Sequence, residues 1–181
     1  MSIHNDVEEI LFTEEQLAEI TKKIGAQINE DYQDKNLLLV SVLKGSLVFM
    51  ADLMRQIRIP CAIDFLAVSS YGNGTTSSGE VRILKDLDQS LEGKDILVVE
   101  DILDSGNTLS FLLKNLSARK PASIRLCTLL DKPERRKAPI KADYVGAVVE
   151  DKFIVGYGLD YAERYRNLPY IGVLKSEIYN H

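Results

Sequence analysis

The sequence of 181 residues lacks several features that mark other classes of protein. Its two cysteines, Cys61 and Cys127, are too few for a disulfide framework and show no metal-ligand spacing. No apolar run approaches the ~20 residues of a membrane helix, and the run at residues 37–43 is far too short. Residues 1–9 contain neither the basic nor the apolar segment of a secretory signal. We therefore expect a reducing, cytoplasmic setting and no membrane partner.

An excess of positive charge is also missing. The formal net charge is −5 and the pI is about 5.1, whereas broad nucleic-acid binding normally requires a basic surface. Nucleic acid is therefore not expected as a partner. The one basic cluster is short and consists of Lys132, Arg135, Arg136 and Lys137. For the last three residues we expect no more than a solvated loop.

Apolar periodicity predicts a single α/β domain over residues 1–181. A capping box at Thr13 and Gln16 opens a helix that ends near residue 30. A third predicted helix covers residues 108–119, and strands are expected at residues 37–43, 61–70, 81–84, 95–100, 124–130, 144–149 and 153–157. This alternation predicts parallel βαβ units and an open sheet. The second helix, before Pro60, has its expected apolar face at Leu47, Met50, Met54 and Ile57.

Within the strand at residues 61–70, side chains of two kinds alternate: Ile63, Phe65 and Ala67 with Asp64 and Leu66. The next segment, residues 69–80, has almost nothing to bury. It is either a disordered hairpin tip or a lid that closes over a site.

Residues 96–108 form the most informative segment, Ile-Leu-Val-Val-Glu-Asp-Ile-Leu-Asp-Ser-Gly-Asn-Thr. An apolar strand ends in Glu100 and Asp101, and Asp104 opens a small-residue turn before a helix. Such a turn directs backbone N–H groups and a helix N-terminus at one spot, which suits a phosphate. A sugar, a cation or a proton transfer would each explain the carboxylates. Lys44, Asp104 and Lys132 all follow strand ends, which indicates one shared site.

The segment at residues 98–108 resembles the phosphoribosyl-pyrophosphate signature of type I phosphoribosyltransferases. Residues 43–45 are similar to the pyrophosphate loop, residues 70–71 to the start of the lid, and residues 151–161 to the purine-binding segment. With Arg166, this ordered set resembles the bacterial-type hypoxanthine-guanine phosphoribosyltransferases. The resemblance implies an open, mostly parallel twisted sheet flanked by helices. It also implies a small hood formed by the terminal segments and a flexible lid at about residues 69–80.

The reaction implied is transfer of the 5-phosphoribosyl group from 5-phosphoribosyl 1-pyrophosphate to N9 of a 6-oxopurine. Hypoxanthine or guanine would give IMP or GMP, with release of pyrophosphate, as in purine salvage. The resemblance further implies Mg²⁺, held by Glu100, Asp101 and Asp160, and a homodimer or homotetramer. Lys44, Gly45 and Arg166 would bind the pyrophosphate. The family also implies a cis peptide between Leu43 and Lys44.

Each residue of the implied site also has an ordinary alternative. Glu100 and Asp101 would hold the ribose hydroxyls, directly or through the metal, or form a solvated strand end. Asp104 would accept the proton from purine N7 as general base, or cap its loop. Asp160 would be a metal-associated carboxylate or a turn residue. The 5′-phosphate would bind at Ser105, Gly106, Asn107 and Thr108, and the lid contacts would be Ser70 and Tyr71.

Base recognition is expected from three residues. Lys132 would donate to the purine 6-oxygen, which would disfavour a 6-amino purine, unless it is one more surface lysine. The resemblance implies that Phe153 stacks on the purine, although periodicity alone predicts a core residue. Because tryptophan is absent, stacking must fall to Phe153 or a tyrosine. The Ile154 backbone would contact the ring edge. A xanthine-preferring enzyme and a regulatory RNA- or DNA-binding protein on the same fold are the alternatives that remain.

Overall fold

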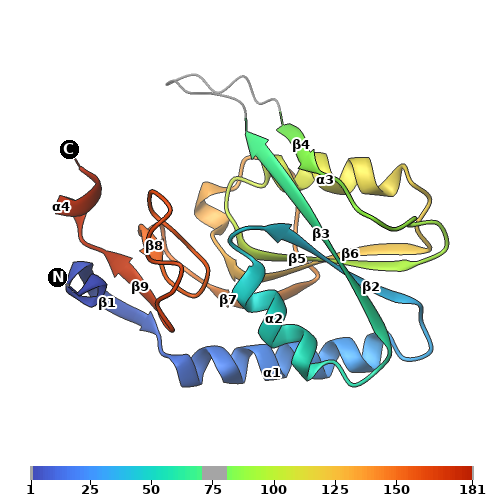
Figure 1. Cartoon of the computed structure of the whole chain (residues 1–181), viewed down its shortest axis with the longest axis horizontal. Helices are drawn as coiled ribbons and strands as arrows, with labels where there is room; N and C mark the ends of the chain where they lie inside the picture. Colours follow the sequence, from blue (N-terminus) through green and yellow to red (C-terminus); the bar gives the residue numbers. More distant parts are fainter. Residues whose placement is uncertain (1, 71–80, 181) are drawn as a thin grey trace.

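The computed structural model describes residues 2–70 and 81–180, which form two sheets and their flanking helices (Figure 1). The six-stranded sheet has the order β4-β3-β2-β5-β6-β7, in which only β4 runs antiparallel to its neighbour. Its strands are β2 (Leu37–Leu43), β3 (Cys61–Ser70), β4 (Val81–Lys85), β5 (Asp95–Leu103), β6 (Ser123–Asp131) and β7 (Tyr144–Val148). The helices are α1 (Glu14–Asp31), α2 (Leu47–Gln56), α3 (Asn107–Ser117) and α4 (Ser176–Tyr179), with 3-10 turns η1 (Ile3–Asp6) and η2 (Pro133–Arg135).

The predicted hood is a second, three-stranded antiparallel sheet of order β1-β9-β8. Its strands are β1 (Val7–Phe12), β8 (Ile154–Val155) and β9 (Ile171–Leu174), so both terminal segments meet at one end of the molecule (Figure 1). The strand predicted at residues 153–157 is thus shorter than expected and does not belong to the large sheet. Its short length leaves Phe153 just outside the ladder.

Apolar side chains cover both faces of the large sheet, as expected for strands buried on both sides. Along β5, Leu97 and Val99 pack with α1 and α2, while Ile96 and Val98 pack with α3. Figure 1 shows α1 and α2 on the face opposite α3. Among the described residues, no helix is both long enough and apolar enough to span a membrane.

The capping box of α1 is confirmed, since Gln16 N–H donates to Thr13 and Thr13 N–H donates to the Gln16 side chain. The predicted face of α2 is confirmed at Met50, which is buried, and at Ile57, which packs against the core, but it is wrong at the other two positions. Leu47 and Met54 are 48% and 38% exposed. The buried residues are Phe49, Met50 and Leu53, because the large Phe49 ring turns that side of the helix toward the sheet and α1.

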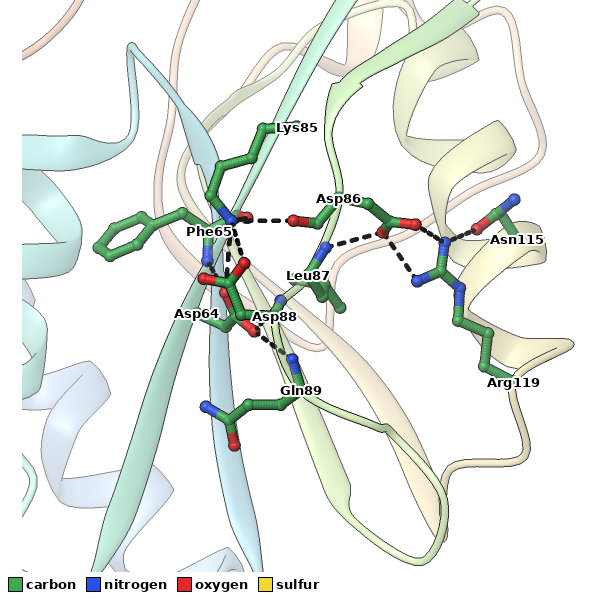
Figure 2. A network of polar contacts seen from close by, with 9 residues as sticks. All are labelled: Asp64, Phe65, Lys85, Asp86, Leu87, Asp88, Gln89, Asn115 and Arg119. Carbon is green, nitrogen blue, oxygen red and sulfur yellow. Dashed lines mark hydrogen bonds and ion pairs between the residues drawn. The ribbon is translucent and has the colours of Figure 1, made fainter.

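Asp64, which alternation places among apolar neighbours in β3, lies on the more buried face and is 3% exposed. Its carboxylate accepts N–H bonds from Phe65, Asp88 and Gln89, and Lys85 Nζ lies 3.8 Å away (Figure 2). A buried carboxylate that is satisfied in this way is tolerated in the interior. Nearby, the Arg119 guanidinium donates two hydrogen bonds to the Asp86 carboxylate in a bidentate pair. This pair holds the segment after β4 against the end of α3.

The predicted strand at residues 95–100 extends to Leu103 in β5. Glu100 pairs in register with Thr128 and Ile102 with Leu130 of β6. Glu100 and Asp101 are therefore inside the ladder and each is 9% exposed, rather than at a solvated strand end. The turn that follows begins only at Asp104.

Candidate active site

The carboxyl ends of β5 and β6 line a pocket of about 350 Å³ that gathers most of the residues predicted to bind the base. Asp104 lies at the end of β5 and Lys132 at the end of β6, and the hood contributes Phe153 and Ile154. A larger cavity of about 560 Å³, between α1, α2 and residues 166–169, contains only Arg166 of the predicted site. We place the candidate site at the smaller pocket, because that is where the predicted side chains converge.

Lys132 is a buried ammonium, 5% exposed, and the surface-lysine alternative is wrong. Its Nζ donates to the Lys152 carbonyl at 2.6 Å and lies 3.8 Å from the Asp151 carboxylate. Burial lowers the pKa of Lys132, although the carboxylates of Asp104 and Asp151 oppose that shift. An ammonium has three N–H donors. Lys132 can therefore donate to a ligand carbonyl in the pocket as well as to Lys152.

Asp104 lines the same pocket, and one of its two carboxylate oxygens, Oδ1, is buried. Its side chain is 40% exposed, and the Arg135 guanidinium lies 3.1 Å from Oδ1 without forming an aligned hydrogen bond. Within the described chain, Oδ1 has no hydrogen-bond donor. The exposed part of this carboxylate faces the pocket and can accept a proton from a ligand.

The predicted phosphate loop joins β5 to α3. Gly106 has φ +80° and is the N-cap of α3, so the helix N-terminus opens at Asn107 beside Ser105. A Cβ at Gly106 would lie 2.5 Å from the Ile140 side chain, which together with the positive φ explains why glycine occupies this position. The N–H groups of the first turn of α3, including that of Thr108, have no intrahelical partner and can bind an anion.

Arg136 supports this loop from behind, and the prediction of a solvated loop is wrong for it. Its guanidinium donates to the carbonyls of Asp104 at 2.9 Å, Ile140 at 2.7 Å and Leu103 at 3.2 Å, and it pairs with Asp131. Its side chain is 16% exposed. Sequence reasoning missed this role because nothing in the pattern distinguishes Arg136 from its exposed neighbour Arg135.

Glu100 and Asp101 form a buried acidic pair beside the pyrophosphate loop. Burial, followed by the adjacent Asp101 carboxylate, raises the pKa of Glu100 well above its ordinary value. Burial also raises the pKa of Asp101, while hydrogen bonds with Glu100 and backbone N–H groups oppose the shift. A Cβ on Gly45 would lie 1.9 Å from Asp101 Oδ2, so this glycine lets the loop approach the carboxylate closely. The positive charge of Arg166 also acts on Asp101, in the direction that lowers its pKa.

The pyrophosphate side of the site is exposed and rich in ion pairs. The peptide between Leu43 and Lys44 is cis, as predicted. Lys44 Nζ donates to Glu163 Oε2 at 2.8 Å, and Arg166 donates to Glu163 Oε1 at 3.3 Å and forms an ion pair with Asp160 at 2.9 Å. Arg166 Nε is buried and has no acceptor within the described residues. Such a donor is suited to an oxygen of an anionic ligand.

The three predicted metal ligands do not converge. Asp160 pairs with Arg166 and accepts the Glu163 N–H at 2.9 Å. Within residues 2–70 and 81–180 no group of three or more potential ligand side chains is arranged for a metal ion. Of the two lid residues, Ser70 ends β3, and Tyr71 lies with residues 72–80 outside the described residues.

Besides Arg136, the charged and aromatic residues at the site that the sequence did not single out include Arg135, Asp151, Glu163 and Tyr179. Arg135 and Asp151 line the base pocket beside Asp104 and Lys132. The position of Glu163 three residues after Asp160 hinted at a second carboxylate on the same loop. For Tyr179 no local signal exists, because its neighbours in space are distant in the sequence.

Comparisons with known proteins agree with this geometry. A family model described as phosphoribosyl transferase domain matches residues 7–162. The hypoxanthine-guanine phosphoribosyltransferase of Bacillus subtilis (strain 168) is 58% identical over 175 residues, which make up 97% of each chain. A crystal structure of a hypoxanthine phosphoribosyltransferase from Staphylococcus aureus has a TM-score of 0.96 and 55% identity, covering 99% of this chain and 97% of that one.

A longer relative also matches. The bifunctional protein TilS/HprT of Listeria monocytogenes serovar 1/2a is 55% identical over 179 residues, and the chain spans 28% of the length of that protein. The match with the B. subtilis protein, by contrast, is nearly complete in both directions. The chain therefore belongs to the phosphoribosyltransferase family and, within it, to the hypoxanthine-guanine phosphoribosyltransferases.

Proposed function

We propose that the chain transfers the 5-phosphoribosyl group of 5-phosphoribosyl 1-pyrophosphate to N9 of hypoxanthine or guanine, which forms IMP or GMP in purine salvage. The bond from C1′ to the pyrophosphate oxygen breaks and the bond from C1′ to N9 forms. The observation that carries this proposal is the buried Lys132 ammonium in one pocket with Asp104 and Phe153. That arrangement offers a donor for a 6-oxygen, an acceptor for a proton and an aromatic face for a purine.

At the base, Lys132 donates to the 6-oxygen while Phe153 stacks on the ring and the Ile154 backbone contacts its edge. Asp104 accepts the proton that leaves N7 when N9 bonds to C1′. The Arg135 guanidinium lies 3.1 Å from this carboxylate. A 6-amino purine would direct its own N–H groups at Lys132, so the same residue excludes adenine.

At the sugar, the first turn of α3 with Ser105, Gly106, Asn107 and Thr108 holds the 5′-phosphate. Glu100 and Asp101 accept from the ribose 2′- and 3′-hydroxyls, directly or through a metal. At the leaving group, Lys44, the Gly45 backbone and Arg166 bind the pyrophosphate, supported by the unpartnered Arg166 Nε. Ser70 and Tyr71 complete the lid in this proposal.

The residues present fit a magnesium ion that shares its coordination with the substrate. Glu100 and Asp101 are adjacent carboxylates whose pKa values are raised chiefly because both are buried. Mg²⁺ commonly takes one or two carboxylates together with substrate oxygens and water. When bound, it would neutralise negative charge at the pyrophosphate. Asp160 would join this site only after release from Arg166.

The setting that we propose is the cytoplasm, with the chain as a homodimer or homotetramer. Cys61 is exposed and unpaired, and Cys127 is buried and unpaired, which suits a reducing compartment. Sedimentation equilibrium with and without 5-phosphoribosyl 1-pyrophosphate measures the assembly state. A monomer under both conditions would contradict this part of the proposal.

The deciding experiment is a pyrophosphate-release assay with Mg²⁺, 5-phosphoribosyl 1-pyrophosphate and hypoxanthine, guanine, xanthine or adenine. We expect the 6-oxopurines to be used and adenine to be slower by ~10⁴-fold in kcat/KM. A preference for xanthine would reassign the substrate within the same reaction. Equal rates with adenine would contradict the role of Lys132, and no release with any base would overturn the proposed function.

A further inference from the structure

The C-terminal helix α4 places an aromatic residue directly on the base pocket. The Tyr179 ring is stacked on Phe153, with ring centroids 4.6 Å apart and an interplanar angle of 19°. Tyr161 meets both rings edge-on, at 5.6 Å from Phe153 and 6.4 Å from Tyr179. Tyr179 also lines the pocket that contains Lys132 and Asp104. The C-terminal segment is therefore part of the wall of the candidate purine site.

Backbone pairing in the hood sheet brings Phe153 and Tyr179 next to each other. Phe153 directly precedes β8, and α4 follows β9 after one residue. The two strands are antiparallel neighbours, in which Ile154 pairs with Val173 and the Leu174 N–H donates to the Phe153 carbonyl at 2.9 Å. The ladder thus brings the start of β8 and the end of β9 side by side. The contact between Phe153 and Tyr179 is a consequence of this register.

Phe153 keeps room for a second stacking partner. Tyr179 covers one face of its ring, yet Phe153 remains 39% exposed and lines the pocket. A phenyl ring on a single torsion with a broad energy minimum turns readily unless neighbours restrict it. Stacking on one face and an edge contact from Tyr161 hold the ring in one orientation. Ordering a contact surface before a ligand arrives reduces the entropy that binding must otherwise overcome.

We propose that Tyr179 is a positioning residue for base recognition: it supports one face of Phe153 so that the purine stacks on the other. This inference rests on the proposed function, in which Phe153 contacts the base. Tyr179 acts through Phe153 and takes no part in proton transfer or in pyrophosphate binding. Its removal should therefore weaken binding of the base and spare the sugar pyrophosphate.

The test compares Tyr179→Ala and Tyr179→Phe with the wild type in the pyrophosphate-release assay. For Tyr179→Ala we expect the KM for hypoxanthine to rise roughly 3- to 10-fold, the range of an aromatic pair, with the KM for 5-phosphoribosyl 1-pyrophosphate unchanged. Tyr179→Phe keeps the ring and should restore the wild-type KM. Tyr170→Ala is the matched control, because Tyr170 lies just before β9 and its ring contacts His4 instead of Phe153.

Each other outcome counts against the inference. A lower KM for hypoxanthine in Tyr179→Ala would show that the tyrosine occupies the place of the base. An unchanged KM, or an equal rise in Tyr170→Ala, would show that the stack does no more than stabilise the hood. An equal rise in the KM values of both substrates would exclude a role specific to the base. If the wild type releases no pyrophosphate, the proposed function fails first, and this inference fails with it.

Discussion

Two lysines, Lys132 and Lys44, follow parallel strands of the same sheet and bear the same charge, but their surroundings are opposite. Lys132 is 5% exposed and is held by the Lys152 carbonyl. The Lys44 side chain is 66% exposed and paired with an equally exposed Glu163. The side of the site that we propose for the base is therefore buried and hydrogen-bonded before a ligand arrives, whereas the side that we propose for the pyrophosphate is largely exposed to solvent. The difference suits a base that must be selected and a leaving group that must depart.

The largest loss of activity is expected when Lys132, in the buried part of the site, is replaced. Lys132→Met removes the ammonium with little change in side-chain length and should lower kcat/KM for hypoxanthine by ~10³-fold, because the 6-oxygen loses its buried donor. The variant should also lose its discrimination against adenine. Steady-state kinetics with both bases measure this. Lys137→Met, at an exposed position five residues away, is the control and should behave as the wild type.

The second-largest loss of activity is expected for Asp104→Asn. The amide keeps the shape of the side chain but cannot accept the N7 proton, so we expect kcat to fall by ~10²-fold with the fold and the KM for 5-phosphoribosyl 1-pyrophosphate unchanged. Single-turnover rates distinguish this effect from slow product release. Asp88→Asn makes the same exchange at a side chain that is 80% exposed. Near-normal turnover by Asp104→Asn would show that this carboxylate only caps its loop.

Arg135 and Arg136 repeat the contrast between exposed and buried cations in adjacent residues. Arg136→Met removes the side-chain donor of the Asp104 and Ile140 carbonyls and the partner of Asp131, so the free energy of unfolding should fall by about 2–3 kcal/mol. Arg135→Met removes a side chain that is 52% exposed and should leave the free energy of unfolding nearly unchanged. Urea unfolding of both variants measures the difference. Equal losses would contradict the supporting role of Arg136.

These contrasts also explain which parts of the fold and of the site could be predicted from the sequence. Fully apolar runs and the capping box predicted most of the large sheet and α1, because both signals are local. The pairing of Phe153 with Tyr179 depends on the register of β8 and β9, two short strands with little periodicity. The choice of Arg136 over Arg135 depends on which side chain meets the end of β5. Both are tertiary facts that no spacing between neighbours encodes.

The buried lysine should also leave a pH-dependent signature in stability. Burial lowers the pKa of Lys132 below its ordinary value of 10.5, so the folded protein releases this proton at a lower pH than the unfolded chain does. In that window the unfolded state binds more protons, and the stability of the wild type rises with pH. The stability of wild type relative to Lys132→Met should therefore increase between the lowered pKa and about 10.5. Urea unfolding of both proteins from pH 7 to 10 measures this, and a constant difference would contradict it.

The smallest change in kinetics is expected when Glu163, in the exposed part of the site, is replaced. In the free chain its carboxylate bridges Lys44 and Arg166, the two cations that would bind pyrophosphate, so the substrate must displace it. The hydrogen bond from Lys44 lowers the pKa of Glu163, which keeps the competing charge in place at neutral pH. Glu163→Gln should therefore lower the KM for 5-phosphoribosyl 1-pyrophosphate by roughly 2- to 3-fold, since exposed ion pairs contribute little.

The control for this variant is Glu19→Gln, which weakens an exposed ion pair with Lys22 on α1, far from the site. The KM for hypoxanthine should stay unchanged in both, and the inhibition constant of pyrophosphate should fall only in Glu163→Gln. Raising the salt concentration should reduce the difference, because exposed charges are screened. A higher KM for the sugar pyrophosphate would mean that Glu163 orients Lys44 for the substrate. Lys44 would then be oriented before the substrate binds, as Lys132 is. The two lysines would differ only in how exposed their side chains are.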